Sequence, residues 1–223
     1  MLLSTGTCEP SENWAFVPFR SISKNDVENA LSFFDMANVP FIWPVLLGAD
    51  KHYGRALTDA GLFMRGELLA MRADNISLDA PLDIAFRSVK TESDAVLWAH
   101  TTWRAFSDSS DSLPDAPDSF VALSRGLLTN DSFEMNIAYR EGEPIGAFMV
   151  VSGKSELGVY YFATHPKKRR CGVGLAMMNE CSRIAAGRVI VLQSTPSGAP
   201  FYTSVGFKTL FAIPLHSREE SVF

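Results

Sequence analysis

The stretch His165–Met178, HPKKRRCGVGLAMM, decides how this sequence is interpreted. Four consecutive cations lead into two glycines, an apolar helix-like segment follows, and the strand-like LGVYYFAT (157–164) precedes them. A strand, a glycine-containing loop and a helix offer unpaired backbone N–H groups and the positive end of a helix dipole to an anion. Because the glycines admit close approach and Arg169 and Arg170 add charge, the stretch predicts a phosphate or pyrophosphate site.

Two common nucleotide motifs do not fit this stretch. The triphosphate-binding pattern G-x-x-x-x-G-K-[ST] is absent. The dinucleotide pattern needs a third glycine, where Met177 stands, and an acidic residue about 20 positions further on, where the chain reads LQST (192–195). The phosphate site therefore belongs to another class of ligand.

A third pattern fits two separate stretches. FATHPKKRRCGVGLA (162–176), with Arg169-x-x-Gly172-x-Gly174, resembles the acetyl-CoA loop of the GNAT N-acetyltransferase superfamily. VLQSTPSGAPFYTSVGF (191–207) resembles the next motif of that superfamily, which ends in aromatic-Tyr-x-x-x-Gly-Phe. Many members carry Asn seven residues before the tyrosine, and this chain has Thr195 there. The order of elements from residue 83 onward also agrees with the superfamily fold.

The resemblance implies a place for the cofactor. Two parallel strands, 159–164 and 188–193, would splay apart and admit the pantetheine arm of acetyl-CoA. Backbone groups of Phe162, Ala163 and Thr164 would pair with that arm. The pyrophosphate would be held by backbone amides of Arg169, Arg170, Cys171, Gly172, Val173 and Gly174.

The resemblance also implies a chemistry. An amine would attack the thioester carbonyl directly, and Tyr202 would protonate the thiolate that leaves. A phenol of pKa about 10 can give its proton to a thiolate of pKa about 8.5 only if the site assists. The superfamily has no fixed base for the amine, and Glu134, Glu156 and His100 are candidates by charge type alone.

Alternating helix-like and strand-like segments predict an α/β (α+β) fold: a GNAT-like mixed, mostly antiparallel central sheet with splayed parallel strands and flanking helices. We expect a GNAT domain over residues 81–223 and an N-terminal α/β segment over residues 1–80. Helices are predicted at 25–37, 51–60, 91–106 and 120–128, and strands at 41–46, 62–73, 83–90, 133–140, 145–151, 157–164, 188–193 and 207–215. Apolar residues alternate from 133 to 139, which predicts a half-buried strand, whereas 157–164 is predicted to be buried on both faces.

The N-terminal segment contains a stretch with weak similarity to the tyrosine motif. ALTDAGLF (56–63) aligns with FYTSVGFK (201–208), and Leu57 then corresponds to Tyr202. This alignment predicts a degenerate half-GNAT repeat that has no proton donor at that position. We expect residues 1–80 to wall the acceptor pocket together with the Ser- and Asp-rich loop 107–119.

Composition limits the partners and the compartment. The net charge of −5 argues against general nucleic-acid binding. The sequence shows no signal peptide and no apolar stretch long enough to span a bilayer, so a cytoplasmic protein without membrane contact is expected. Cys8, Cys171 and Cys181 lack metal-ligand spacing, so no metal site and reduced thiols are predicted.

These observations predict an acetyl-CoA-dependent N-acetyltransferase that acts on a primary amine of a small molecule or a peptide. The first alternative is a non-catalytic acyl-CoA-binding or interaction module that retains the cofactor loop. The second is a nucleic-acid or protein partner bound by the cations 167–170, with affinity that falls steeply with salt.

Overall fold

The computed structural model describes residues 1–17, 21–46, 48–49, 52–74, 76–81, 83–106 and 114–220. The fold is mixed α/β, with an eight-stranded, mostly antiparallel sheet and flanking helices, which confirms the predicted fold class. The chain forms two compact units. One comprises Met1–Ala70, Ser194–Ala199 and Leu210–Phe223, and the other comprises Met71–Gln193 and Pro200–Thr209. The predicted domain boundary after residue 80 stays a prediction.

The second unit contains most of the predicted elements. In chain order they are β5 (Ala85–Ser88), α3 (Glu92–Phe106), α4 (Asp118–Leu127), β6 (Phe133–Arg140), β7 (Glu143–Ser152), β8 (Glu156–Thr164), the 3-10 turn η2 (Pro166–Lys168), α5 (Val173–Ala185), β9 (Val189–Ser194) and α6 (Ala199–Ser204). The strand order is β9-β8-β7-β6-β5. Strand β8 pairs with β9 in parallel, and the pairings among β5, β6, β7 and β8 are antiparallel.

Local chemistry explains where α3 begins. Thr91 Oγ1 accepts the amide of Asp94 at 3.1 Å, and the Asp94 carboxylate accepts the amide of Thr91 at 3.1 Å. This reciprocal capping box satisfies two helix-terminal donors, so α3 begins directly after Thr91. The first turn also carries Glu92 and Asp94, which complement the helix dipole.

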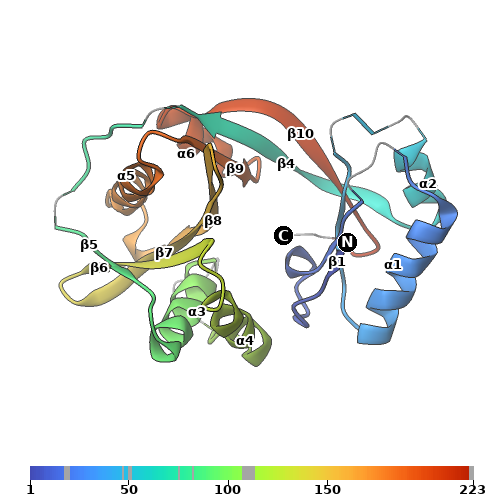
Figure 1. The fold of residues 1–223 in the computed structure, drawn as a ribbon, viewed down its shortest axis with the longest axis horizontal. Helices are drawn as coiled ribbons and strands as arrows, with labels where there is room; N and C mark the ends of the chain where they lie inside the picture. Colours follow the sequence, from blue (N-terminus) through green and yellow to red (C-terminus); the bar gives the residue numbers. More distant parts are fainter. Residues whose placement is uncertain are drawn as a thin grey trace. The chain divides into compact units, whose positions relative to one another are not determined.

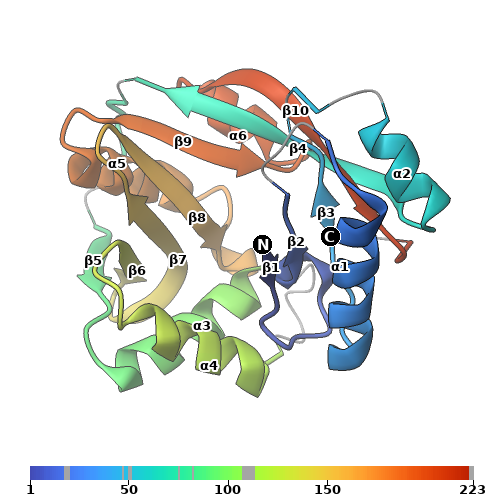
Figure 2. The same cartoon turned by 45° about the vertical axis from the view of Figure 1, so that its right-hand side comes forward.

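Helices cover both faces of the sheet formed by β6, β7 and β8. Figures 1 and 2 show α3 and α4 on one face and α5 on the other. The α3/α4 face buries Trp98, Phe120, Met135, Ile137, Ala147 and Met149. The opposite face of β6 is buried as well: Asn136 is 2% exposed, and its amide Nδ2 donates to Glu134 Oε1 at 3.1 Å. The prediction that 133–140 is half-buried was therefore wrong. Alternation of apolar and polar residues shows the polarity of each face, whereas burial also depends on the helix packed on that face.

The first unit has its own core. Its elements are β1 (Leu2–Leu3), the 3-10 turn η1 (Pro10–Glu12), β2 (Trp14–Ala15), α1 (Lys24–Ala37), β3 (Trp43–Pro44), α2 (Tyr53–Asp59), the larger part of β4 (Phe63–Ala73) and most of β10 (Lys208–Ser217). Ser23 and Asp26 form a second capping box at the start of α1. Of the predicted strand 41–46 only Trp43 and Pro44 are strand, and β1 and β2 were not predicted. No helix in the described part of the chain is long and apolar enough to cross a membrane.

The aligned segments around residues 57 and 202 share a local conformation. The carbonyls of Leu57 and Tyr202 each accept the amide five residues later, at 2.9 and 3.0 Å. Gly61 and Gly206 then take positive φ angles of 82° and 101°, and a strand begins two residues further on in each case. This helix, glycine and strand sequence is common in proteins, so the repeat itself stays a prediction.

Candidate functional site

The two parallel strands of the second unit separate part of the way along. The strands β8 and β9 pair at only three positions, which are Glu156–Val189, Leu157–Ile190 and Gly158–Val191. Strand β8 nevertheless continues to Thr164 and β9 to Ser194. Burial changes near the same point: residues 157–159 are buried, Tyr160 is exposed, and of residues 161–164 only Ala163 is buried. Continuous burial, predicted for all of 157–164, therefore holds only for residues 157–159.

A bulge in β8 accompanies the separation. The register with β7 runs from Met149–Tyr160 to Ala147–Ala163, so Phe148 alone faces both Tyr161 and Phe162. Tyr161 takes a φ of 48°, which is unusual for a residue other than glycine. The extra residue bends β8, as bulges do. The indole Nε1 of Trp98 donates to the carbonyl of Phe148 at 3.2 Å, which satisfies a buried acceptor at the bulge.

The basic loop (residues 165–174) follows directly on β8. It contains η2, then Arg170 at φ 61° and Gly172 at φ 80°, and α5 begins at Val173 without a side-chain cap. The first amide that closes a helical turn is that of Ala176, which donates to Gly172 O at 3.0 Å. Among the described residues, no acceptor is found for the backbone amides of residues 170–175. Such unpaired amides at a helix N-terminus form an anion site.

The two arginines of the loop differ in what they contact. The guanidinium of Arg169 donates to Ala105 O at 3.0 Å and to Thr164 O at 3.4 Å. It therefore satisfies the carbonyl end of α3, and its side chain is engaged by the protein. Arg170 is exposed and forms no ion pair within the described part of the chain. Arg170 is thus the arginine whose charge is available to an anion.

Tyr202 lies on α6 in an aromatic cluster. Its ring centroid is 5.2 Å from that of Phe201, 5.7 Å from Phe207 and 6.0 Å from Phe162. Burial raises the pKa of the Tyr202 hydroxyl far above its ordinary value. No hydrogen bond of this hydroxyl is found among the described residues. Tyr202 therefore keeps its proton and offers a donor beside the unpaired half of β8.

Close packing brings the loop and α6 together. A Cβ atom at Gly174 would lie 3.1 Å from Cζ of Phe201, so only glycine allows this approach without movement of the ring. The structure thus gathers three features at one end of β8: the segment 162–164, the amides 170–175 and the hydroxyl of Tyr202. All three are visible in the sequence as local patterns, whereas no local pattern indicates the supporting contacts of Trp98 and Arg169.

Two of the three candidate bases, Glu156 and Glu134, do not join this group. Glu156 begins β8, six residues before Phe162, which places them about 20 Å apart along the strand. Glu134 accepts the hydrogen bond from Asn136 on β6, which is separated from β8 by β7.

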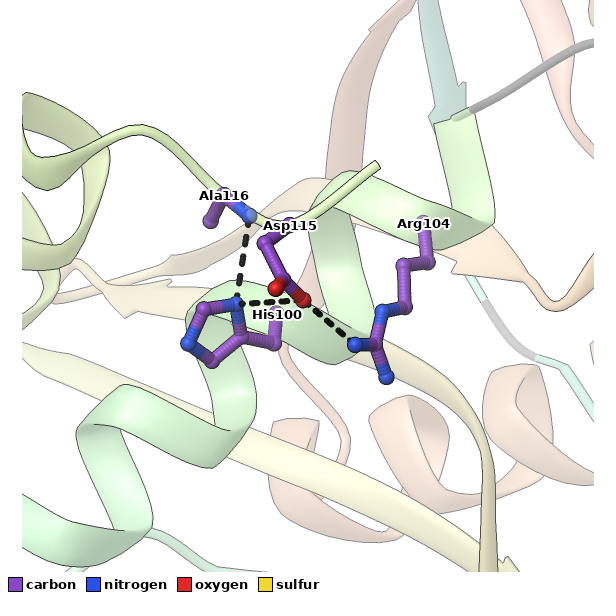
Figure 3. A network of polar contacts seen from close by, with 4 residues as sticks. All are labelled: His100, Arg104, Asp115 and Ala116. Carbon is purple, nitrogen blue, oxygen red and sulfur yellow. Dashed lines mark hydrogen bonds and ion pairs between the residues drawn. The ribbon is translucent and has the colours of Figure 1, made fainter. Parts of the chain in front are cut away.

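His100 belongs to a polar network between α3 and the segment before α4 (Figure 3). Its Nδ1 accepts the amide of Ala116 at 3.1 Å and lies 3.6 Å from Asp115 Oδ1, which also pairs with Arg104. Nδ1 is therefore engaged in holding the segment before α4. Residues 107–113 of the predicted acceptor loop lie outside the described residues.

Metal ligands and cysteines are two other kinds of reactive group. Within the described residues, no group of His, Cys, Asp and Glu could hold a metal ion. The three cysteines are free, and Cys181 is buried in α5. Burial raises the pKa of the Cys181 thiol well above its ordinary value, so this sulfur is protonated and unreactive.

Comparison with known proteins gives consistent results. Residues 131–209 match the family model described as an acetyltransferase (GNAT) domain. A GCN5-related N-acetyltransferase from Kribbella flavida is 12% identical, with a TM-score of 0.65 over 93% of this chain and 81% of that one. A functionally unknown conserved protein from Staphylococcus epidermidis is 13% identical, with a TM-score of 0.66 over 94% and 85%. A tandem GNAT protein from the clavulanic acid biosynthesis pathway is 11% identical, with a TM-score of 0.57 over 89% and 69%. No curated protein matches the sequence.

Proposed function

Since residues 131–209 place this chain in the GNAT acetyltransferase superfamily, we propose that it transfers an acetyl group from acetyl-CoA to a primary amine of a small molecule or a peptide. The observation that carries the proposal is the juxtaposition at the end of β8. An open strand edge, six unpaired amides and a protonated tyrosine meet there, and each suits a different part of acetyl-CoA.

The binding features fit the two polar parts of the cofactor. The unpaired amides 170–175, the dipole of α5 and the charge of Arg170 suit a pyrophosphate. Ala163 and Thr164 pair with β7 on one side, and no register joins them to β9 on the other. Their free edge suits the amide groups of a pantetheine arm, which can pair with a strand edge as a peptide does.

Tyr202 supplies the proton in the proposed reaction. Acetyl-CoA brings a thioester whose carbonyl carbon is open to attack by a neutral amine. The new N–C bond forms, the C–S bond breaks, and the sulfur takes the bonding electron pair. The hydroxyl of Tyr202 donates its proton to the developing thiolate. The acylated nitrogen gives up its extra proton to water, and a proton returned from water restores the phenol.

The substitution Tyr202→Phe tests this role because it retains the ring and removes only the hydroxyl. We expect an unchanged Kd for acetyl-CoA and a kcat lower by about 100-fold, within the range for one general acid. Binding is measured by calorimetry and turnover by release of free thiol. Tyr139→Phe is the matched control, since the Tyr139 hydroxyl is buried without a partner on β6. A Tyr202→Phe protein with the wild-type kcat would remove the tyrosine from the mechanism.

A non-catalytic acyl-CoA-binding module is the alternative, and it is favoured by one observation. Glu156 and Glu134 lie away from the end of β8, and Nδ1 of His100 already accepts the amide of Ala116. Both functions predict that acetyl-CoA stabilises the fold, by about 2.7 kcal/mol at a hundredfold excess over Kd. Only the enzyme releases thiol when amines are added. Stabilisation without release, across small amines and peptides, would establish the module.

A further inference from the structure

A segment between the two sequence halves lies along α5. We call residues 76–81 the strap. Ser182 Oγ donates to the carbonyl of Ile76 at 2.7 Å. The side-chain amide of Asn179 donates to Leu78 O at 2.7 Å and accepts from Leu78 N at 2.9 Å. From Ile76 to Leu78 the partner on α5 changes from Ser182 to Asn179, which is closer to the N-terminus of the helix. The strap therefore runs antiparallel to α5 and ends at the basic loop.

The end of the strap touches the loop directly. A Cβ atom at Gly172 would lie 2.5 Å from Cγ of Pro81, so the proline ring rests on the glycine. Beyond the strap, Asp83 pairs with Arg140 at the end of β6, with Nη2 donating to Oδ1 at 3.1 Å. Nε also approaches Oδ2 to 2.8 Å, though without hydrogen-bond alignment.

Arg140 links this pair to the loop. Its Nη2 also donates to the carbonyl of Cys171 at 3.4 Å, and its side chain is only 20% exposed. One guanidinium therefore joins Asp83, two residues beyond the strap, to the middle of the loop. Because Asp83 neutralises it, Arg140 adds little net charge to the anion site.

The loop needs such external support. Arg170 and Gly172 both have positive φ, and for Arg170 this conformation is intrinsically unfavourable. An unfavourable backbone conformation persists only where its surroundings determine it. The amides of 170–175 make no bonds among the described residues that would hold them, whereas Pro81 and Arg140 contact Gly172 and the carbonyl of Cys171.

We propose that Arg140 is a positioning residue for cofactor binding, which together with Pro81 holds the basic loop in the conformation that presents its amides to a pyrophosphate. The inference rests on the proposed acetyl-CoA site. It assigns Arg140 no contact with the ligand. In this proposal the strap supports the basic loop in addition to connecting the two halves of the chain.

The test must separate positioning from charge, because Arg140→Gln alone would leave the Asp83 carboxylate unpaired beside the site. The double variant Arg140→Gln, Asp83→Asn removes one charge of each sign and preserves the net charge. We expect its Kd for acetyl-CoA to rise about 3- to 10-fold, which is the range for the net loss of one ordinary hydrogen bond, because the Arg140 Nη2 to Cys171 O bond is long at 3.4 Å. The kcat at saturating cofactor should not change. The matched control is Arg183→Gln with Glu180→Gln, which removes an ion pair within α5 and should leave Kd unchanged.

A second readout does not need the ligand. In the double variant, the NMR order parameter of the Gly172 amide should fall from about 0.85, the value of a rigid backbone, toward 0.6. If the double variant does not fold, Arg140→Lys replaces it, and its single ammonium should give a smaller rise in Kd. Suppose that the wild type binds acetyl-CoA and that the double variant has the same Kd and the same Gly172 order parameter. This result would overturn the inference but would not contradict the proposed function. A wild-type protein that does not bind acetyl-CoA would overturn both.

Discussion

Replacing Gly172 by alanine should destabilise the fold through two separable effects. The first is conformational, because φ is 80° at this position and alanine pays about 1–2 kcal/mol there. The second is steric, because the new Cβ would lie 2.5 Å from Cγ and 2.8 Å from Cδ of Pro81. The proline ring is fixed to its own backbone and cannot rotate away, so the overpacking adds about 1–3 kcal/mol.

Gly187 provides the matched control. Its φ is 87°, and no atom lies within 4 Å of where its Cβ would be. Gly187→Ala should therefore cost only the conformational part, about 1–2 kcal/mol, whereas Gly172→Ala should cost about 2–5 kcal/mol. Made in a Pro81→Ala background, Gly172→Ala should lose its steric part and cost about as much as Gly187→Ala.

The assay is urea unfolding of the four single and double variants, with the slope of free energy against urea compared between them. The Gly172–Pro81 cycle should give a coupling of about 1–3 kcal/mol, in the range for directly contacting residues. Two results would contradict the steric contact between Gly172 and Pro81. One is an equal loss of stability in Gly172→Ala and Gly187→Ala, and the other is a loss in Gly172→Ala that Pro81→Ala does not change. Either result would mean that the strap does not rest on the loop.

Three further predictions concern the cores and a buried histidine. Trp98→Phe should cost about 1–3 kcal/mol in urea unfolding, because the buried carbonyl of Phe148 loses its donor. Cys181→Ser should cost about 1–3 kcal/mol because it buries a hydroxyl, while Cys171→Ser, at an exposed site, should cost less than about 0.5 kcal/mol. Burial lowers the pKa of His216, so the unfolded chain takes up the proton first and stability should fall as the pH drops below the ordinary value of 6.5. Unfolding free energies measured from pH 8 to pH 5 should show a shallower fall in His216→Gln than in the wild type, and equal slopes would contradict the assignment.

Local sequence determined much of the fold and the place of the site. The range of α3, the alignment that pairs Gly61 with Gly206, and the apolar helix-like segment after the basic loop depend on a few neighbouring residues, so the sequence alone predicts them. The basic loop and the tyrosine motif were likewise found as patterns. The parallel strands separate where the resemblance placed the gap, although the roles of the residues along it remain proposals.

Tertiary structure decided what surrounds these elements. The burial of Asn136, the bulge opposite Phe148 and the turn of Arg169 toward Ala105 all depend on packing between segments distant in sequence. The strap is the clearest case, since Leu78 and Asn179 bond across 101 positions of the chain. The periodicity of apolar residues indicates which face of one helix or strand is polar, and a motif indicates the backbone conformation of a few residues. The partner that a side chain meets is fixed only when the helices and strands close on one another, so the contacts that hold the loop in place are visible in the structure alone.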